Sequence, residues 1–201
     1  RCFDPEFLYS FMNYLAHSYL AFSEEQIVGQ FLEDVIPNRD RFSFPEGRQQ
    51  GITLHREVET FTDAHPEIQA AKKIFSPLVR LYSGAFVDVS MDYFLANSLS
   101  EDVLRNYAEK VYEILRKHEE FLPEKLLRMV NSMEKDNWLY NYKEDFGIKY
   151  SMQNVLNKAK YLEKDLAVFT IFLNNKPQLK QYFDSFFPDL YHHVKEVSKR
   201  F

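Results

Sequence analysis

The chain has 201 residues, of which 45% are hydrophobic and 16% aromatic, a composition typical of a folded globular protein and unlike that of a disordered one. Its net charge of −5 argues against a general nucleic-acid-binding protein, although residues 149–201 carry nine Lys and Arg against five acids, a local charge of +4. The single cysteine, Cys2, excludes a disulfide within the chain and favours a reducing cytoplasm. No apolar run approaches the ~18 residues needed to span a bilayer, and no signal peptide is recognisable, so we expect a cytoplasmic protein that does not bind membranes.

The spacing of apolar residues predicts helices along the whole chain. Only five Gly and eight Pro interrupt it, no stretch alternates with a period of two, and no repeat or linker marks a second domain. We therefore predict an all-α fold, a single-domain helical bundle over residues 1–201. The predicted helices cover residues 7–22, 24–34, 45–63, 67–75, 85–97, 101–118, a stretch opened by Pro123, 151–162, 164–173 and 178–199.

Capping and breaking residues predict several helix boundaries. Ser23 is a good N-cap, and Gln26 stands three residues later at the capping-box position. Pro66 suits the first position of a helix, because its missing N–H would have no partner there. Ser83-Gly84 is expected to separate two helices, and Pro188 is expected to bend the last one.

The helix predicted over residues 45–63 concentrates polar side chains. Each fourth residue of a helix advances about 40° around the axis, so His55, Glu59 and Asp63 lie along one slowly drifting stripe. Imidazole and carboxylate groups in a row suit a divalent metal ion. Taken alone, however, such a stripe is more often a solvated helix face.

Three other predicted helices offer imidazole and carboxylate groups beside apolar residues: His17, Asp34, and the pair Asp88 and Asp92 one turn apart. One histidine on an apolar face is usually a core residue, but several such groups on helices that share a core are harder to explain in this way. Histidine and carboxylate ligands without thiolates indicate Mn²⁺, Mg²⁺ or Fe²⁺ rather than a cysteine-bound zinc. Such a centre would activate water for attack on a phosphate ester, with Arg56 binding the phosphate oxygens.

Four motifs resemble, in order and spacing, those of the acyl carrier protein (ACP) phosphodiesterase family. They are Met12-Asn13-Tyr14-Leu15-Ala16-His17, Gly29-Gln30-Phe31-Leu32-Glu33-Asp34, Gly51-Ile52-Thr53-Leu54-His55-Arg56 continuing to Thr62-Asp63, and Asp88-Val89 followed by Asp92 and Phe94-Leu95. Residues 152–156 and Phe187-Pro188 also resemble the family. The resemblance covers the chain from Met12 onward and leaves residues 1–11 outside it; whether they are an extension or belong to an alternative start stays open, and we assign them no function.

The resemblance implies a divergent, all-helical relative of the HD-type metal phosphohydrolases. It implies Mn²⁺-dependent hydrolysis of the phosphodiester that joins 4′-phosphopantetheine to a serine of holo-ACP, with release of apo-ACP. The metal and water ligands that it implies are His17, Asp34, His55, Asp88 and Asp92. Asp34 and His55 are expected to be catalytic as well, together with Arg56 as phosphate clamp and Asp63, and Glu59 is a further acid nearby.

The sequence departs from the family pattern at three positions. Gln30 stands where Asn is expected, Glu59 where Asp is expected, and Tyr93 where His is expected. The last change removes an imidazole, and it would weaken or abolish the centre if that imidazole were a ligand. Two alternatives therefore stay open: an HD-type phosphohydrolase for a nucleotide or another small phosphodiester, and a non-catalytic helical module that binds ACP. Because ACP is strongly acidic, we also expect a basic docking surface.

Overall fold

The computed structural model describes residues 13–201, so residues 7–12 of the first predicted helix lie outside the described residues. All regular structure in this range is helical, which confirms the all-α prediction. The α-helices are α1 (Tyr14–Tyr19), α2 (Glu24–Leu32), α3 (Glu46–Ala64), α4 (Pro66–Val79), α5 (Ser83–Ser98), α6 (Glu101–Lys117), α7 (Glu124–Lys135), α8 (Trp138–Asn141), α9 (Asp145–Lys158) and α10 (Val168–Ser198). Within residues 13–201, no helix has both the length and the apolar character that crossing a bilayer requires.

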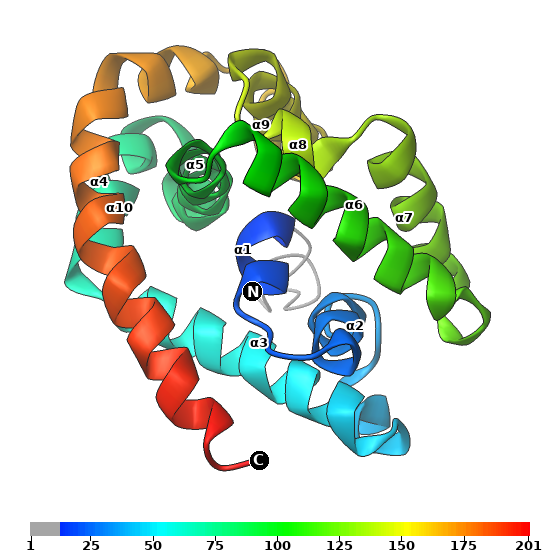
Figure 1. The fold of residues 1–201 in the computed structure, drawn as a ribbon. Coiled ribbons are helices and arrows are strands. Elements are labelled where there is room, and N and C mark those ends of the chain that lie inside the picture. Colours follow the sequence, from blue (N-terminus) through cyan, green and yellow to red (C-terminus); the bar gives the residue numbers. More distant parts are fainter. Residues whose placement is uncertain (1–12) are drawn as a thin grey trace.

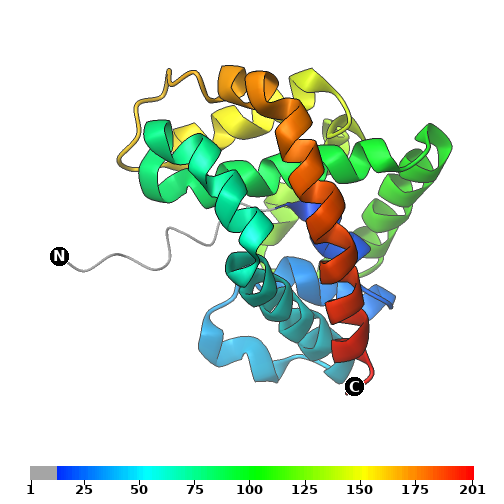
Figure 2. The ribbon, with the colours of Figure 1, turned by 90° about the vertical axis from the view of Figure 1, so that its left-hand side faces the viewer.

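Helix α10 is one helix of 31 residues, so the prediction of two helices over 164–173 and 178–199 is wrong. Pro177 and Pro188 both lie inside it. Each proline removes one backbone hydrogen bond and bends a helix, but neighbouring bonds and packing can carry the helix past it. Phe172 and Phe183, one on each side of Pro177, are buried in the core and supply that packing. Figures 1 and 2 show α10 curving along one side of the molecule.

The predicted break at Ser83-Gly84 is also wrong, because α5 begins at Ser83 and Gly84 lies in its first turn. The chain turns instead at Arg80, which has a φ of 52° and ends α4. Helix α4 therefore continues past its predicted end at residue 75 to Val79, with Pro77 inside it.

Two predicted helix starts are confirmed. Ser23 caps α2, and its side chain accepts a hydrogen bond from the backbone N–H of Gln26 at 3.2 Å. The Gln26 side chain reaches back to the backbone N–H of Phe22 at 2.8 Å, one residue further than in a standard capping box. Pro66 is the first residue of α4, and His65 caps that helix.

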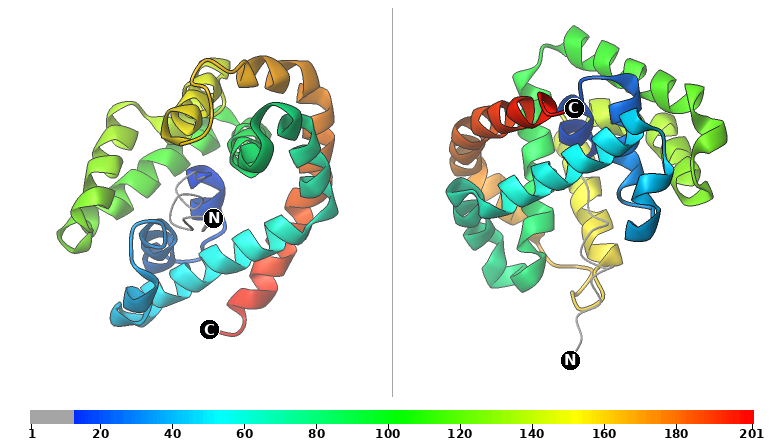
Figure 3. Two further views of the ribbon diagram at one scale, coloured as in Figure 1. Left: turned by 180° about the vertical axis from the view of Figure 1, so that it is seen from behind. Right: turned by 90° about the horizontal axis from the view of Figure 1, so that it is seen from below.

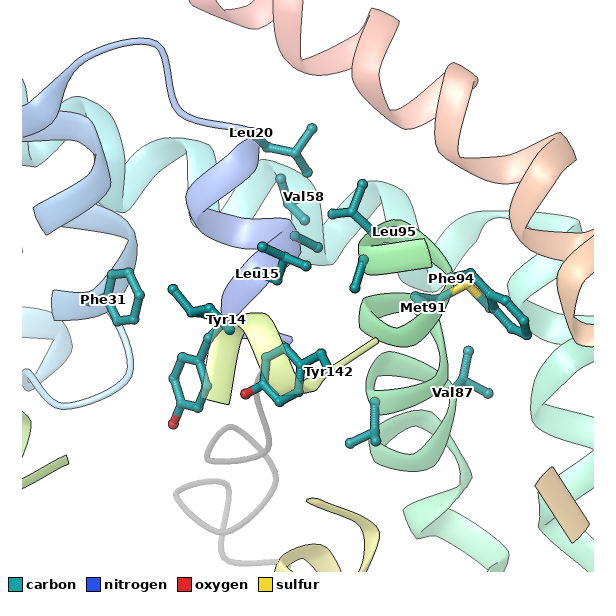
Figure 4. Close-up of a cluster of buried hydrophobic side chains, with 14 of the residues drawn as sticks. Tyr14, Leu15, Leu20, Phe31, Val58, Val87, Met91, Phe94, Leu95 and Tyr142 are labelled. Carbon is teal, nitrogen blue, oxygen red and sulfur yellow. The ribbon is translucent and has the colours of Figure 1, made fainter. Parts of the chain in front are cut away.

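Helix α1 lies in the middle of the molecule, enclosed by α2, α3, α5 and α6 (Figures 1 and 3). Its apolar side chains join the main core. Figure 4 shows Leu15 of α1 and Leu20, the residue directly after α1, grouped with Val58 of α3 and Leu95 of α5. A polar residue on α1 is therefore inside the bundle, and His17 is only 1% exposed.

Helices α2 and α3 approach so closely that their backbones touch. A Cβ atom added to Gly29 would lie 2.2 Å from the carbonyl oxygen of Arg48 and 2.8 Å from the Cα of Gly51. A Cβ atom on Gly51 would lie 2.2 Å from the carbonyl oxygen of Gln26. The two glycines of the sequence motifs thus bring the last turns of α2 against the middle of α3, where His55 lies.

Candidate metal centre

Three side chains from α1 and α3 form a group that is suited to a metal ion. His17, His55 and Glu59 each place one ligand atom within 4.8 Å of the others. The two imidazole rings stack with their centres 3.9 Å apart and their planes 14° apart. His17 and His55 are buried, whereas the Glu59 side chain is 37% exposed, so the group is closed on the core side and reaches solvent through Glu59.

The orientation of His55 is set by α2. Its Nδ1 lies 2.9 Å from the carbonyl oxygen of Gln30, and because a carbonyl can only accept, Nδ1 carries the proton. The lone pair of His55 is then on Nε2, as in a histidine prepared to bind a metal. Burial, and then the neighbouring His17, hold the pKa of His55 well below its usual 6.5, which favours the neutral ring that a ligand requires.

His17 is held between two acceptors. Its Nδ1 lies 2.9 Å from Oε1 of Gln30, and its Nε2 lies 2.8 Å from Oε1 of Glu59. A neutral imidazole has one N–H, so it can donate to only one of these oxygens. Turning the Gln30 side-chain amide by 180° would place its Nε2, which has no hydrogen-bond partner among the described residues, against Nδ1 of His17, and Nε2–H of His17 would then donate to Glu59.

Two further aspartates lie beside this group. Oδ1 of Asp34 is 3.6 Å from Nε2 of His55, and Oδ2 is buried without a hydrogen-bond partner among the described residues. Burial, and then the charges of Glu59 and Glu33, raise the pKa of Asp34 well above its usual value. Asp88 is half-buried, and burial followed by the charge of Glu59 raises its pKa in the same direction. A divalent cation would offset the repulsion between these carboxylates and would give Oδ2 of Asp34 a partner.

Asp92 lies outside this group and holds α1 instead. Its two carboxylate oxygens accept the backbone N–H groups of Leu15 at 3.2 Å and Ala16 at 2.9 Å. These are among the first N–H groups of the helix, which have no partner within it, and the side chain of Asn13 at the N-cap position makes no capping bond. Asp92 therefore caps α1 from α5 and sets the position of His17.

Arg56 and Asp63 point to other partners. Nε of Arg56 donates to Glu33 at 2.7 Å, and its Nη2 donates to Asn38 at 2.8 Å. The Asp63 side chain is 71% exposed and pairs with Lys72 at 2.7 Å. The structure thus leaves Arg56 one residue from His55 but bound to a carboxylate, and it leaves Asp63 on the surface.

Tyr93 stands where the family pattern has an imidazole, and its side chain faces α10. Its ring packs edge-on against Phe172 at 5.3 Å, and Nζ of Lys176 lies 4.4 Å from the ring centre. Its neighbour Asp92 faces α1, on another side of α5.

Two residues have a larger part in the site than the sequence predicts, Glu59 and Gln30. The helical spacing predicts Glu59 on one stripe with His55, but the family resemblance implies only a further acid at this position and not a ligand. Gln30 was noted only as a departure from the pattern, yet its backbone and side-chain oxygens contact both histidines. Its position directly after the motif glycine Gly29 is the sequence signal for this role.

These features define a helical protein with a histidine–carboxylate group between its helices, an arrangement that bundles use for metal centres. The family model described as acyl carrier protein phosphodiesterase matches residues 12–190, and the chain belongs to that family. Similar relatives include the acyl carrier protein phosphodiesterases of Escherichia coli strains HS and SMS-3-5, each 32% identical over an alignment of 156 positions that covers 73% of this chain and 76% of theirs. No solved structure matches the chain. The resemblance expected from the motifs is confirmed at the level of the family.

Proposed function

We propose that this protein is a metal-dependent phosphodiesterase that releases 4′-phosphopantetheine from holo-ACP and leaves apo-ACP. Membership of the acyl carrier protein phosphodiesterase family supports the reaction and the substrate. The observation that supports the metal is the group of His17, His55 and Glu59. The proposal includes Mn²⁺ as the ion, a divergent relationship to the HD-type phosphohydrolases, a single domain and a cytoplasmic location.

The residues present fit a divalent ion. His17, His55 and Glu59 would hold it, and Asp34 and Asp88 would complete its carboxylate surroundings. The unpartnered buried oxygen of Asp34 supports this assignment, because it is a contact that a cation would satisfy. When bound, the ion would polarise the phosphate and lower the pKa of a bound water.

The protein groups have separate roles in this proposal. Gln30 keeps the proton of His55 on Nδ1 and so leaves Nε2 available on the metal side. Asp92 holds the start of α1 and thereby His17. Arg56 binds the phosphate oxygens after exchanging its contact with Glu33 for the substrate, which the partial exposure of its side chain allows.

Incubation of the purified protein with holo-ACP and Mn²⁺ tests the function directly. We expect the ACP mass to fall by that of the phosphopantetheine group, and a chelator to stop the reaction. Glu59→Gln should lower kcat on the order of 100-fold or more. Glu57→Gln is the matched control, because Glu57 lies on the same helix with 36% of its side chain exposed and contacts His193.

An unchanged ACP mass at saturating Mn²⁺ would contradict the proposal. A panel of nucleotides and small phosphodiesters, run in parallel, separates the proposal from a hydrolase of other substrates. Because ACP is acidic and would dock by charge, the rate of its hydrolysis should fall as salt is added. The rate for a small phosphodiester without other charged groups should change much less.

A further inference from the structure

Two adjoining cavities lie along α9, away from the group of His17, His55 and Glu59. The larger has a volume of about 380 Å³ and the smaller about 80 Å³. Both are lined by Trp138, Tyr142, Tyr150 and Ser151, so the two cavities adjoin, and together they are called the hollow. The larger volume is at the lower end of the range for small-molecule sites, about 300–1,000 Å³.

Four residues on one face of α9 line the hollow from one end to the other. Phe146, Tyr150, Asn154 and Lys158 are spaced four residues apart, so they lie on one slowly drifting face of the helix. Phe146 lines the larger cavity, Tyr150 lines both, and Asn154 and Lys158 line the smaller. Twelve residues of helix correspond to about 18 Å. The Phe146 side is open to solvent, since Phe146 is 62% and Tyr150 54% exposed.

The Lys158 end of the hollow adjoins the candidate metal centre. The smaller cavity is lined there by Tyr14, three residues before His17 on α1, and by Val89, the residue after Asp88 on α5. The positive charge of Lys158 acts on Asp34, where it is one of the lesser influences and lowers the pKa. The hollow thus runs from the surface at Phe146 to Lys158, whose charge acts on Asp34 beside the metal centre.

Trp138 provides a hydrogen-bond donor in the hollow. Its indole Nε1 is buried and has no hydrogen-bond partner among the described residues, although Trp138 lines both cavities. An indole N–H is a donor only, and a buried donor without an acceptor is unfavourable. A ligand with a carbonyl oxygen in this hollow would supply the missing acceptor.

We propose that the hollow is the subsite for the 4′-phosphopantetheine arm of the substrate, with the phosphate end at Lys158 and the thiol end at Phe146. This inference rests on the proposed function. The arm has about 12 bonds from the ester oxygen to the sulfur, roughly 15 Å when extended, and so fits within the length of this face of α9. Its two amide carbonyls are acceptors for Trp138, and its carbon chain suits the aromatic walls.

Pantetheine itself, without phosphate or ACP, is the first probe. Trp138 is the single tryptophan of the chain, so its fluorescence reports on this hollow alone. We expect a saturable change when metal-free protein is titrated with pantetheine, and binding about tenfold weaker in Tyr150→Ala. Tyr161→Ala is the control, because Tyr161 is 77% exposed and does not line either cavity, and it should bind as the wild type does. Thermal melts of each variant establish that it is folded.

Hydrolysis kinetics supply the second test. Trp138→Phe and Tyr150→Ala should each raise KM for holo-ACP about tenfold and change kcat little, because they remove contacts made equally in the ground and transition states. The subsite would be overturned by the absence of a fluorescence change up to millimolar pantetheine, or by KM values within about twofold of the wild type in both variants. In either case, hydrolysis of holo-ACP by the wild type would still uphold the proposed function. Saturable pantetheine binding without hydrolysis of holo-ACP would uphold the subsite and remove the proposed function.

Discussion

Replacing Gly51 with alanine should separate α2 from α3 and thereby disturb the metal centre. The new Cβ would lie 2.2 Å from the carbonyl oxygen of Gln26 and 2.8 Å from the Cα of Gly29. Both are backbone atoms, so no side chain can rotate away. Because Cβ contacts below 3.0 Å essentially do not occur, the helices must separate locally by at least the difference between 3.0 and 2.2 Å, which is 0.8 Å.

The hydrogen bond from His55 to the carbonyl of Gln30 crosses the same contact. At 2.9 Å it would lengthen to about 3.7 Å if the full displacement of 0.8 Å fell along it, beyond the range of a hydrogen bond. Overpacking costs about 1–3 kcal/mol and a lost buried hydrogen bond about 1–3 kcal/mol, while alanine favours a helix over glycine by about 1 kcal/mol. We expect Gly51→Ala to lower the free energy of unfolding by about 3 kcal/mol.

Guanidinium unfolding and Mn²⁺ titration measure the two effects. Gly84→Ala is the control, because a Cβ there would meet only the end of the Lys72 side chain, at 3.3 Å, and the variant should be unchanged or more stable by up to about 1 kcal/mol. Mn²⁺ affinity should fall in Gly51→Ala and not in Gly84→Ala. Equal stability and equal Mn²⁺ affinity in the two variants would refute the argument that the glycine contact positions His55.

Three further predictions concern the ion, Tyr93 and Asp92. Mn²⁺ at about 100 times its dissociation constant should stabilise the protein by about 2.7 kcal/mol and raise its Tm by roughly 5–10 °C in a calorimetric melt, and an unchanged Tm would argue against a metal site. Tyr93→His should leave Mn²⁺ affinity within about twofold in a calorimetric titration, because position 93 faces α10, and a tenfold gain would show that the centre lacks this imidazole. Burial raises the pKa of Asp92 from 3.8 to about 7, against the two backbone hydrogen bonds that lower it. The folded protein therefore binds the proton more tightly than the unfolded chain does. The stability of the metal-free wild type relative to Asp92→Asn should accordingly fall as the pH rises from about 4 to 7, by roughly 4 kcal/mol, and a pH-independent difference in urea unfolding would contradict this.

The fold class and several helix starts follow from local chemistry. Ser23 and Pro66 begin α2 and α4 as predicted, because a capping side chain and a proline act within a few residues. Pro177 shows the limit of such reasoning. Its local effect is to interrupt a helix, but Phe172 and Phe183 are buried on either side of it, and this packing depends on parts of the chain far away in sequence.

The candidate site shows the same division between local and distant causes. Helical periodicity placed His55, Glu59 and Asp63 on one stripe, but the drift of about 40° for every four residues amounts to about 80° between His55 and Asp63. Glu59 accordingly meets His17, while Asp63 turns to the surface and Lys72.

Asp92 shows what a single sequence does not contain. An acid in an apolar helix indicates a buried cationic or N–H partner, and the sequence motif suggested a metal ion for this role. In the structure its partners are the backbone amides of Leu15 and Ala16, 77 and 76 residues away in the chain. The hollow along α9 is equally hidden, because Trp138 and Tyr150 come together only when α8 packs against α9.

The proposed function depends most on binding of a metal ion by His17, His55 and Glu59, and an Mn²⁺ titration of the metal-free protein tests this binding most directly. We predict saturable binding in the wild type, an affinity at least about tenfold lower in Glu59→Gln, and an unchanged affinity in Glu57→Gln, whose carboxylate is on the same helix but contacts His193. Absence of Mn²⁺ binding in the wild type, or equal affinities in Glu59→Gln and the wild type, would contradict the proposed metal binding.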